Sequence, residues 1–371
     1  MAASAHAPLG HFDHGGHTYG RADAIDFSAS LNPLGMPETS VAALRDNVSA
    51  FEGYPDVCNK QLAEAVAAFE GIDVLRTCMC AGATDAFDRI VDVFKPKSVL
   101  LFDPCFSGYE RALRRCGASV AHVALRKEDD FDFTERALGE ACAALAMEDG
   151  PELVFLCTPN NPTGRAVSED FLRGLASYAQ HRDARVVVDE CFADLAGLAS
   201  ATALQEKFDN LIIVKAFTKT FAMAGLRAGY IICPDAEMAR QLHDAGAQWS
   251  VSVPAQIAGV AAFQDVTYLM RSLAYIGKER IRLESALSDA GMFVVPSCAN
   301  FILFQDVAAA ERTADASLPE ASLFDALAER GIIVRRCGNF EGLDDSWYRI
   351  AVRTEEENTR FIHALKEVLD R

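Results

Sequence analysis

A lysine at the end of a predicted strand is the first residue of this chain whose type and position suit covalent chemistry. Lys219 follows an apolar, β-branched stretch at residues 211–214, and small residues lead from it to Arg227. An ammonium group beside a buried strand is costly unless a partner or a chemical task retains it. A Schiff base with a carbonyl cofactor, usually pyridoxal phosphate, is such a task, and Arg227 would bind the cofactor phosphate. The alternative is a surface lysine beside a structural arginine.

Two earlier stretches suit the phosphate and the ring of such a cofactor. Ala83 and Thr84 open a predicted helix after a turn of small residues at 81–84, where free N–H groups and the helix dipole favour an anion. Small residues before a helix are also common without any function. Phe106 follows the strand predicted at 98–102 and is placed to stack on a flat ring, although core packing is the ordinary interpretation of a single phenylalanine.

Two polar residues at later strand ends complete this set. Asn161 lies in the turn-rich run at 158–164, directly after a predicted strand. Asp189 ends another apolar strand, where a carboxylate is costly without a partner. A protonated pyridine nitrogen is a suitable partner, because the ion pair makes the ring a better electron sink. The alternatives for Asp189 are a helix N-cap or a structural salt bridge.

The order of these stretches along the chain resembles that of the fold-type I pyridoxal-phosphate enzymes, the aspartate aminotransferase superfamily, over nearly the whole length. The resemblance implies that Lys219 forms the Schiff base and moves protons, and that Asp189 pairs with the ring nitrogen. It also implies that Asn161 hydrogen-bonds the phenolic oxygen of the ring and that Phe106 stacks on the ring. The residues that it implies for the phosphate are Ala83, Thr84, Thr218 and Arg227.

The same resemblance extends to a partner subunit and to the substrate. Tyr54, in the run Gly-Tyr-Pro-Asp, resembles the tyrosine that reaches the cofactor phosphate of the neighbouring subunit, which implies a homodimer. Arg349 resembles the arginine that binds the substrate α-carboxylate bidentately. A catalytically idle protein of the same fold would be expected to lack Lys219 or Asp189, and both are present.

Within the superfamily the chain resembles most the threonine-phosphate decarboxylases and the histidinol-phosphate aminotransferases, whose substrates carry a phosphate. One shared feature is the run Asn-Pro-Leu-Gly that begins at Asn32, a residue that we assign to the substrate site. The other is an arginine after the run Gly-Ile-Ile-Val, Arg335 or Arg336, which would hold the substrate phosphate. The alternative to decarboxylation is transfer of the amino group to 2-oxoglutarate. The residues that favour the decarboxylase of cobamide biosynthesis include Phe192, Trp249 and the additional cation Arg353.

Three positions depart from the pattern of the family. Ala216 stands where a serine or threonine usually binds the phosphate, and the lost hydroxyl is expected to weaken cofactor binding by roughly 1–2 kcal/mol unless Thr218 or water compensates. Cys191 replaces an alanine that packs under the ring, and Ser252 stands where the decarboxylases usually have an asparagine. These changes leave the cofactor prediction intact and leave the exact substrate open.

The alternation of short apolar strands with helices predicts an α/β fold whose mostly parallel sheet is covered by helices on both faces. We expect residues 46–285 to form a large cofactor-binding domain and residues 1–45 to join 286–371 in a smaller α/β domain, with 307–320 an exposed insertion. The strands predicted for the large domain are 98–102, 119–125, 153–157, 185–188, 211–214 and 228–233. The helices are predicted at 37–48, 61–70, 85–94, 106–116 and 168–180, followed by a long helical region at 254–290.

The composition limits the class of protein further. The chain has 371 residues and a formal net charge of −18, which argues against a nucleic acid partner. Its apolar runs fall short of the roughly 18 residues of a membrane span, it shows no signal segment, and its eleven cysteines lack metal-ligand spacing. We therefore expect a soluble cytoplasmic enzyme without a bound metal. Four histidines crowd the first 17 residues, and we expect this segment to fold over a pocket, with a metal site as the alternative. They are His6, His11, His14 and His17.

Overall fold

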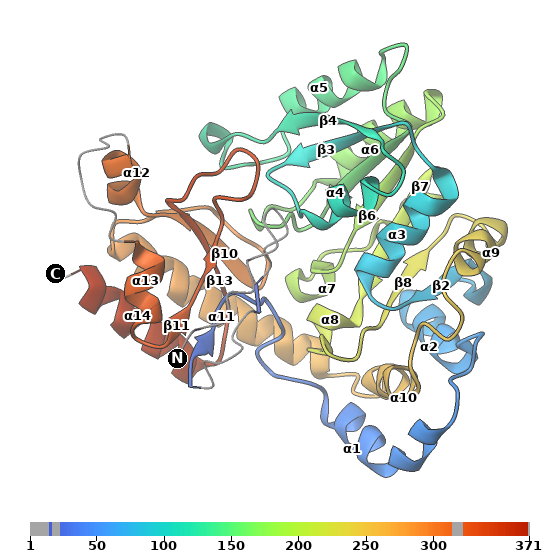
Figure 1. Ribbon diagram of the computed structural model, residues 1–371, viewed down its shortest axis with the longest axis horizontal. Helices are drawn as coiled ribbons and strands as arrows, with labels where there is room; N and C mark the ends of the chain where they lie inside the picture. Colours follow the sequence, from blue (N-terminus) through green and yellow to red (C-terminus); the bar gives the residue numbers. More distant parts are fainter. Residues whose placement is uncertain (1–14, 17–22, 314–321, 370–371) are drawn as a thin grey trace, which may run out of the picture.

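The computed structural model describes residues 15–16, 23–313 and 322–369 (Figure 1). Its main element is a seven-stranded sheet in which β8 runs opposite to the other six strands. This confirms the α/β class and the mostly parallel sheet that the alternation of strands and helices predicts. In spatial order the strands are β2 (Thr77–Cys80), β8 (Gly229–Ile232), β7 (Leu211–Ala216), β6 (Arg185–Asp189), β5 (Leu153–Cys157), β3 (Ser98–Asp103) and β4 (Ser119–Ala124).

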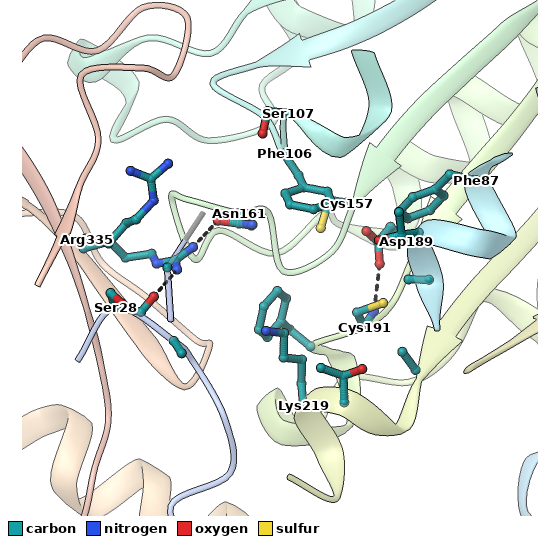
Figure 2. Close-up of a pocket in the computed structure, with 18 of the residues that line it drawn as sticks. Ser28, Phe87, Phe106, Ser107, Cys157, Asn161, Asp189, Cys191, Lys219 and Arg335 are labelled. Carbon is teal, nitrogen blue, oxygen red and sulfur yellow. Dashed lines mark hydrogen bonds between the residues drawn. The ribbon is translucent and has the colours of Figure 1, made fainter. Parts of the chain in front are cut away.

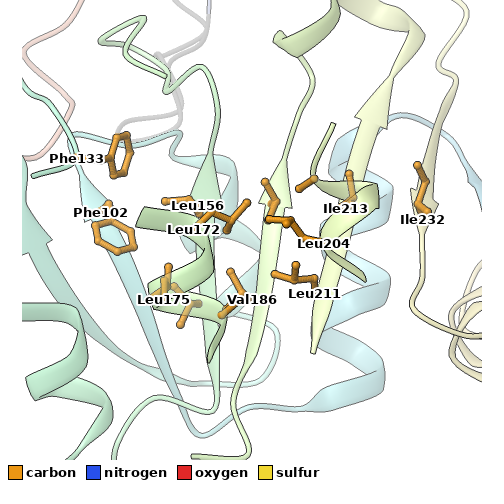
Figure 3. Packing of buried hydrophobic residues seen from close by; sticks show 14 of the residues in the cluster. Phe102, Phe133, Leu156, Leu172, Leu175, Val186, Leu204, Leu211, Ile213 and Ile232 are labelled. Atoms are coloured by element: carbon orange, nitrogen blue, oxygen red, sulfur yellow. The ribbon is translucent and has the colours of Figure 1, made fainter. Parts of the chain in front are cut away.

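Helices cover both faces of the large sheet. Successive residues of its central strands point to opposite sides, and they are apolar on both sides. Leu211 and Ile213 of β7 belong to one core, whereas Ile212 and Val214 belong to the other. Figure 3 shows the first core, where Leu172 lies among the strand residues. The first core is closed by α2 (Lys60–Glu70), α5 (Glu135–Leu145), α6 (Glu169–His181) and α10 (Val253–Ala262), and the second by α3 (Ala83–Phe94), α4 (Gly108–Leu113) and α9 (Ala236–Asp244).

A smaller unit combines the two ends of the described chain. β1 (Ile25–Asp26) pairs in parallel with β11 (Ile332–Ile333), and Figure 1 shows this blue strand beside the red C-terminal elements. The pairing places the N-terminal segment with the C-terminal one, while the domain limits near residues 45 and 285 stay a prediction. Beside it lies an antiparallel sheet in the order β12 (Arg335–Arg336), β13 (Trp347–Ala351), β10 (Phe301–Gln305) and β9 (Phe293–Val294). The smaller unit has a hydrophobic core of its own, and the helices around this core are α11 (Tyr268–Asp289), α13 (Leu323–Ala328) and α14 (Glu355–Leu369).

The helix predicted at 106–116 is shorter in the structure. α4 ends at Leu113 because the N–H groups of Arg115 and Cys116 bond to carbonyls three residues back, which tightens the turn. Gly117, with a φ of +69°, then turns the chain away. At the other end, Phe106 lies outside the helix, in the turn before it, and lines the cavity described below.

The helical region predicted at 254–290 is divided into α10 and α11. Asp265 accepts hydrogen bonds from the N–H and the hydroxyl of Thr267, at 3.2 and 3.0 Å, and this local turn separates the two helices. The segment predicted as an exposed insertion at 307–320 begins with α12 (Val307–Thr313).

The remaining elements are short. No helix within the described ranges is both long and apolar enough to cross a bilayer. The short elements are α1 (Glu38–Asp46), α7 (Ala193–Ala196), α8 (Phe217–Thr220) and the 3-10 helices η2 (Val48–Glu52), η3 (Val74–Arg76), η4 (Lys127–Asp129) and η5 (Ala201–Glu206).

Candidate active site

A cavity of about 310 Å³ lies at the carboxyl ends of the central parallel strands, the usual ligand position in such sheets. Its far wall is formed by the small sheet. Figure 2 shows Asp189 on the side of the large sheet and Arg335 on the opposite side, with Lys219 reaching in between them. The predicted site residues that line the cavity are Ala83, Thr84, Phe106, Asn161, Asp189, Thr218, Lys219, Arg227, Arg335 and Arg349.

Lys219 lies in α8, the single helical turn that follows β7, and its side chain is half-buried. The turn is fastened by Asn32, whose backbone N–H donates to the Lys219 carbonyl at 3.1 Å and whose side-chain amide donates to the Thr220 carbonyl at 2.9 Å. Burial, and next the nearby Arg349 guanidinium, lower the pKa of Lys219 to about 8. A much larger share of this amine is therefore neutral and nucleophilic near neutral pH than for an ordinary lysine.

Asp189 is the last residue of β6 and is only 5% exposed. Its Oδ1 accepts a hydrogen bond from the Cys191 N–H at 3.0 Å, and its Oδ2 accepts one from the Tyr109 hydroxyl at 2.7 Å. Burial raises the pKa of this carboxyl group despite both donors. A buried carboxylate that still has room to accept a further hydrogen bond suits a protonated ring nitrogen.

The first turn of α3 also lines the cavity. Its N-cap, Gly82, has a φ of +88°, and a Cβ there would lie 2.7 Å from Nη2 of Arg227. Glycine therefore allows the guanidinium to lie against the helix N-terminus, where Ala83 and Thr84 line the cavity. An exposed helix N-terminus with an arginine beside it is a site for a phosphate. Ala216 also lines this cavity and contributes no hydroxyl, whereas Thr218 does.

Aromatic rings line the middle of the cavity. Phe106 projects into it from the turn before α4, and a Cβ on Gly108 would lie 2.2 Å from its Cε1, so glycine at 108 makes room for the ring. Phe192 packs edge-on against Phe301 with centroids 4.9 Å apart, and Nζ of Lys219 lies 5.6 Å from the Phe192 centroid. The cavity thus offers flat apolar surfaces for a ring.

Two arginines reach the cavity from the small sheet. Arg335 and Arg349 are cross-strand partners on β12 and β13. Arg349 donates to Oδ1 of Asn161 and, at 2.9 Å, to the Ser28 carbonyl, so its charge meets only neutral oxygens there. Its Nε is buried without a partner among the described residues. Burial, and the positive charge of Arg335, lower the pKa of Arg349 to about 10.

The position of Arg335 is fixed by polar contacts and by a ring. It donates to the Arg336 carbonyl and, at 2.8 Å, to Oδ1 of Asn339, and its guanidinium lies 5.3 Å from the Phe340 centroid. Of the two candidates for the substrate phosphate, Arg335 lines the cavity. Arg336 is exposed and lies 3.9 Å from Asp345.

Three predicted residues do not line the cavity. Asn32 is buried, and its side-chain amide donates to the Thr220 carbonyl and, at 2.8 Å, to the Ser272 hydroxyl, which positions the Lys219 turn; a contact with substrate stays a prediction. Arg353 is paired at 2.8 Å with Glu357 in the first turn of α14, and its assignment to the substrate site stays a prediction. Tyr54 is 83% exposed, packs at a tilt against Trp249 with ring centroids 5.0 Å apart, and is not part of the cavity lining.

Other observations complete the comparison with the sequence. Ser252 caps α10 by accepting from the Ala255 N–H at 3.3 Å. Gly15 lines the cavity, whereas the four N-terminal histidines lie outside the described residues. The lining residues that residue types alone did not single out are Ser28, Ala29, Phe87, Ser107, Cys157 and Phe340. A small or apolar residue carries no chemical signal of this kind in a sequence.

The residues present fit pyridoxal phosphate. The amine of lowered pKa suits the carbonyl of that molecule, and the buried carboxylate suits its ring nitrogen. The aromatic side chain suits the ring face, and the helix N-terminus with its arginine suits the phosphate. When bound, it supplies an electron sink for the electron pair left on a substrate carbon. Lys219 would then carry protons, and the residues around it would orient the cofactor and the substrate.

Comparisons with known proteins agree with this geometry. The family model for aminotransferases of class I and II matches residues 22–365. Threonine-phosphate decarboxylase from Salmonella typhimurium is 31% identical over 349 residues, 93% of this chain and 91% of that protein. Histidinol-phosphate aminotransferase from Symbiobacterium thermophilum is 33% identical over 350 residues, 94% of this chain and 91% of that protein.

A solved structure extends the similarity to the fold. Histidinol-phosphate aminotransferase from Clostridium acetobutylicum matches with a TM-score of 0.81 at 26% identity, over 93% of this chain and 98% of that one. Both curated relatives are enzymes, and the matched family depends on pyridoxal phosphate. The chain therefore belongs to the class I and II aminotransferase family, with the fold-type I architecture and pyridoxal phosphate as its cofactor.

Proposed function

We propose that this enzyme is a threonine-phosphate decarboxylase, which removes CO₂ from a phosphorylated amino acid in cobamide biosynthesis. The observation that carries the proposal is the pair of arginines on one side of the cavity. Arg335 and Arg349 are neighbours across two strands, and both line the space in front of Lys219. Two guanidinium groups so close together suit one small molecule with two anionic groups, here a carboxylate and a phosphate.

In this reaction the side chains of the protein would position the substrate and the cofactor and would then transfer one proton. Arg349 binds the carboxylate, Arg335 binds the phosphate, and Asp189 holds the cofactor ring nitrogen. When bound, the cofactor would take up the electron pair that is left as the bond from Cα to the carboxylate breaks and CO₂ leaves. Lys219 then delivers a proton to Cα, which gives aminopropanol phosphate.

The size of the cavity supports a small substrate. Its volume of about 310 Å³ lies at the lower end of the range of about 300–1,000 Å³ for ligand sites, and the cofactor must share it. Threonine phosphate is smaller than histidinol phosphate, which carries an imidazole ring. Histidinol phosphate also lacks a carboxylate, so it would engage only one of the two arginines with an anion.

An aminotransferase of the histidinol-phosphate type is the second candidate. The relative from Symbiobacterium thermophilum is as similar to this chain as the decarboxylase is, at 33% identity. In that reaction Lys219 would remove the Cα proton, and the amino group would pass to 2-oxoglutarate, whose two carboxylates also suit two arginines. The outcome depends on which bond of Cα stands perpendicular to the ring.

We also propose a homodimer in which Tyr54 reaches the cofactor phosphate of the neighbouring subunit. Its ring is almost fully exposed on a stretch that also exposes Val48, Phe51 and Val57. A soluble chain rarely leaves such a group of apolar side chains in water unless a partner covers them. Trp249 packs against Tyr54 at the edge of this stretch.

Incubation of the holoenzyme with threonine phosphate, with and without 2-oxoglutarate, tests the proposed reaction. Decarboxylation predicts CO₂ and aminopropanol phosphate whether or not 2-oxoglutarate is present. Glutamate that forms only with 2-oxoglutarate, without CO₂, would instead establish the aminotransferase. If neither product appears, the proposed decarboxylase is wrong, and histidinol phosphate with 2-oxoglutarate then tests the second candidate by the same glutamate assay.

A variant of the phosphate-binding arginine tests the substrate class. Arg335→Gln should raise the KM for threonine phosphate by about 10- to 100-fold, because a charge-assisted interaction is lost. Threonine without the phosphate should be turned over poorly and equally by both proteins. Arg336→Gln removes the adjacent exposed arginine and is the matched control, with an unchanged KM.

A further inference from the structure

Tyr109 lies behind the cofactor acid and outside the cavity itself. It is the second residue of α4 and is 1% exposed. Its hydroxyl donates to Oδ2 of Asp189 at 2.7 Å, while Oδ1 is occupied by the Cys191 N–H at 3.0 Å. Both carboxylate oxygens are thus held from the protein side, and the remaining acceptor positions of Asp189 face the cavity.

Three aromatic rings fix the orientation of Tyr109. It stacks on Phe155 with centroids 4.9 Å apart and an interplanar angle of 16°. Phe87 meets it edge-on at 5.0 Å, and Phe106 meets it edge-on at 5.6 Å. Phe106 is the residue that faces the cofactor ring, so one side chain contacts both the ring-stacking residue and the acid.

The direction of the hydrogen bond is set by the environment of the phenol. Burial, and the charge of Asp189, hold the pKa of Tyr109 well above its usual range, so the hydroxyl keeps its proton and can only donate to the carboxylate. A donor of this kind favours the ionised form of the acid. It therefore counteracts burial, which raises the pKa of Asp189.

We propose that Tyr109 is a positioning residue that keeps Asp189 ionised and aimed at the ring nitrogen of pyridoxal phosphate. The inference rests on the proposed pairing of Asp189 with that nitrogen. Without the Tyr109 hydroxyl, Asp189 becomes more basic and draws the shared proton from the ring nitrogen. The ring is then held less tightly and is a weaker electron sink.

The test compares two cofactors with Tyr109→Phe, which removes one oxygen and keeps the stacked ring. Dissociation constants are measured for pyridoxal phosphate and for its 1-deaza analogue, in which carbon replaces the ring nitrogen. Tyr109→Phe should weaken binding of pyridoxal phosphate about tenfold and leave binding of the analogue unchanged, because the analogue makes no hydrogen bond to Asp189.

The matched control is Tyr230→Phe. Tyr230 is also buried and donates to a buried carboxylate, Glu70, at 2.6 Å, but that carboxylate does not line the cavity. This variant should bind both cofactors as the wild type does. Melting temperatures of the apoproteins would show whether each variant is folded.

Two results would overturn the proposal. If Tyr109→Phe weakens binding of both cofactors equally, Tyr109 merely supports the packing of Phe106. If it weakens neither, the hydroxyl has no effect on the ring nitrogen. Asp189→Ala, which leaves no side-chain donor or acceptor at this position, separates this failure from that of the underlying assignment, since a variant that still prefers pyridoxal phosphate over the analogue would show that Asp189 does not bind the nitrogen.

Discussion

The reactivity of Lys219 follows from where its side chain lies. Burial is the main cause of its lowered pKa, and the positive charge of Arg349 adds to it, so that the pKa is about 8. An unperturbed lysine, with a pKa of about 10.4, is almost wholly protonated at that pH. Arg349 thus has two effects in this account, since it would bind the substrate and also raises the neutral share of the amine that must attack a carbonyl.

The rate at which the apoprotein captures pyridoxal phosphate should therefore rise with pH and reach half of its maximum near pH 8. Arg349→Gln removes a positive charge near the amine and should move this midpoint to higher pH. Stopped-flow absorbance across a pH series measures both midpoints. Arg173→Gln, which removes an exposed arginine paired with Glu169, should leave the midpoint unchanged. A wild-type midpoint above pH 10 would contradict the account.

Residue types indicated Asn161, Asp189 and Lys219 because each stands at or just beyond the end of an apolar strand, a position that the sequence reveals. Arg335 and Arg349 were assigned only from the resemblance to the family. Asn32 was harder to interpret, because its partners Thr220 and Ser272 are far away in the chain and only the fold brings them together. Arg353 did carry a local signal, since Glu357 lies one helical turn away. Tyr109 follows Phe106 by three residues, yet nothing in its surroundings along the chain indicates a contact with Asp189.

At the scale of elements, β6 and β7 carry cofactor residues on one face and a buried ionic cluster on the other. Lys215, next to Ala216, pairs with Glu70 and Asp194, both at 2.7 Å. Asp194 also accepts from the Thr220 hydroxyl at 3.2 Å, which links the cluster to the turn that holds Lys219. The alternation of side chains along a strand explains why such different environments adjoin.

Glu190, the neighbour of Asp189, makes the stability of the apoprotein depend on pH. Burial raises its pKa to about 7 even though Lys215 opposes this shift. A carboxyl group whose pKa is raised on folding stabilises the fold below its unfolded pKa of about 4.3 and loses that contribution as pH rises through 7.

Glu190→Gln should therefore exceed the free energy of unfolding of the wild type by only about 1 kcal/mol at pH 5 and by an amount on the order of 3 kcal/mol at pH 8. Urea denaturation of both apoproteins at pH 5 to 8 measures the difference. Glu341→Gln, at an exposed glutamate, supplies the control with no pH trend. A difference that is constant over this range would show that Glu190 does not titrate there.

At the scale of the whole molecule, the strand and helix pattern predicted the class of fold because buried parallel strands are continuous apolar runs. The pairing of β1 with β11 joins residues about 300 positions apart in the chain, and no local pattern reveals such a contact. The limits of α4 depend on hydrogen bonds in a single turn, which residue propensities resolve poorly.

The proposed homodimer predicts complementation between two inactive variants. A dimer of one Lys219→Ala subunit and one Tyr54→Ala subunit contains one site with both native residues if Tyr54 acts across the interface. Separately tagged subunits, refolded together and purified by both tags, should recover activity in one of the two sites. If Tyr54 acts within its own subunit, the mixed dimer will gain nothing over the parent variants.

The most direct test of the account concerns the lysine itself. Holoenzyme treated with borohydride fixes the cofactor to the amine that holds it, and peptide mass spectrometry then locates the attached group. The account predicts a pyridoxyl phosphate group on Lys219 alone, with loss of both the label and the visible absorption band in Lys219→Ala. A label on Lys215 or another lysine, or a Lys219→Ala protein that keeps the band, would contradict it.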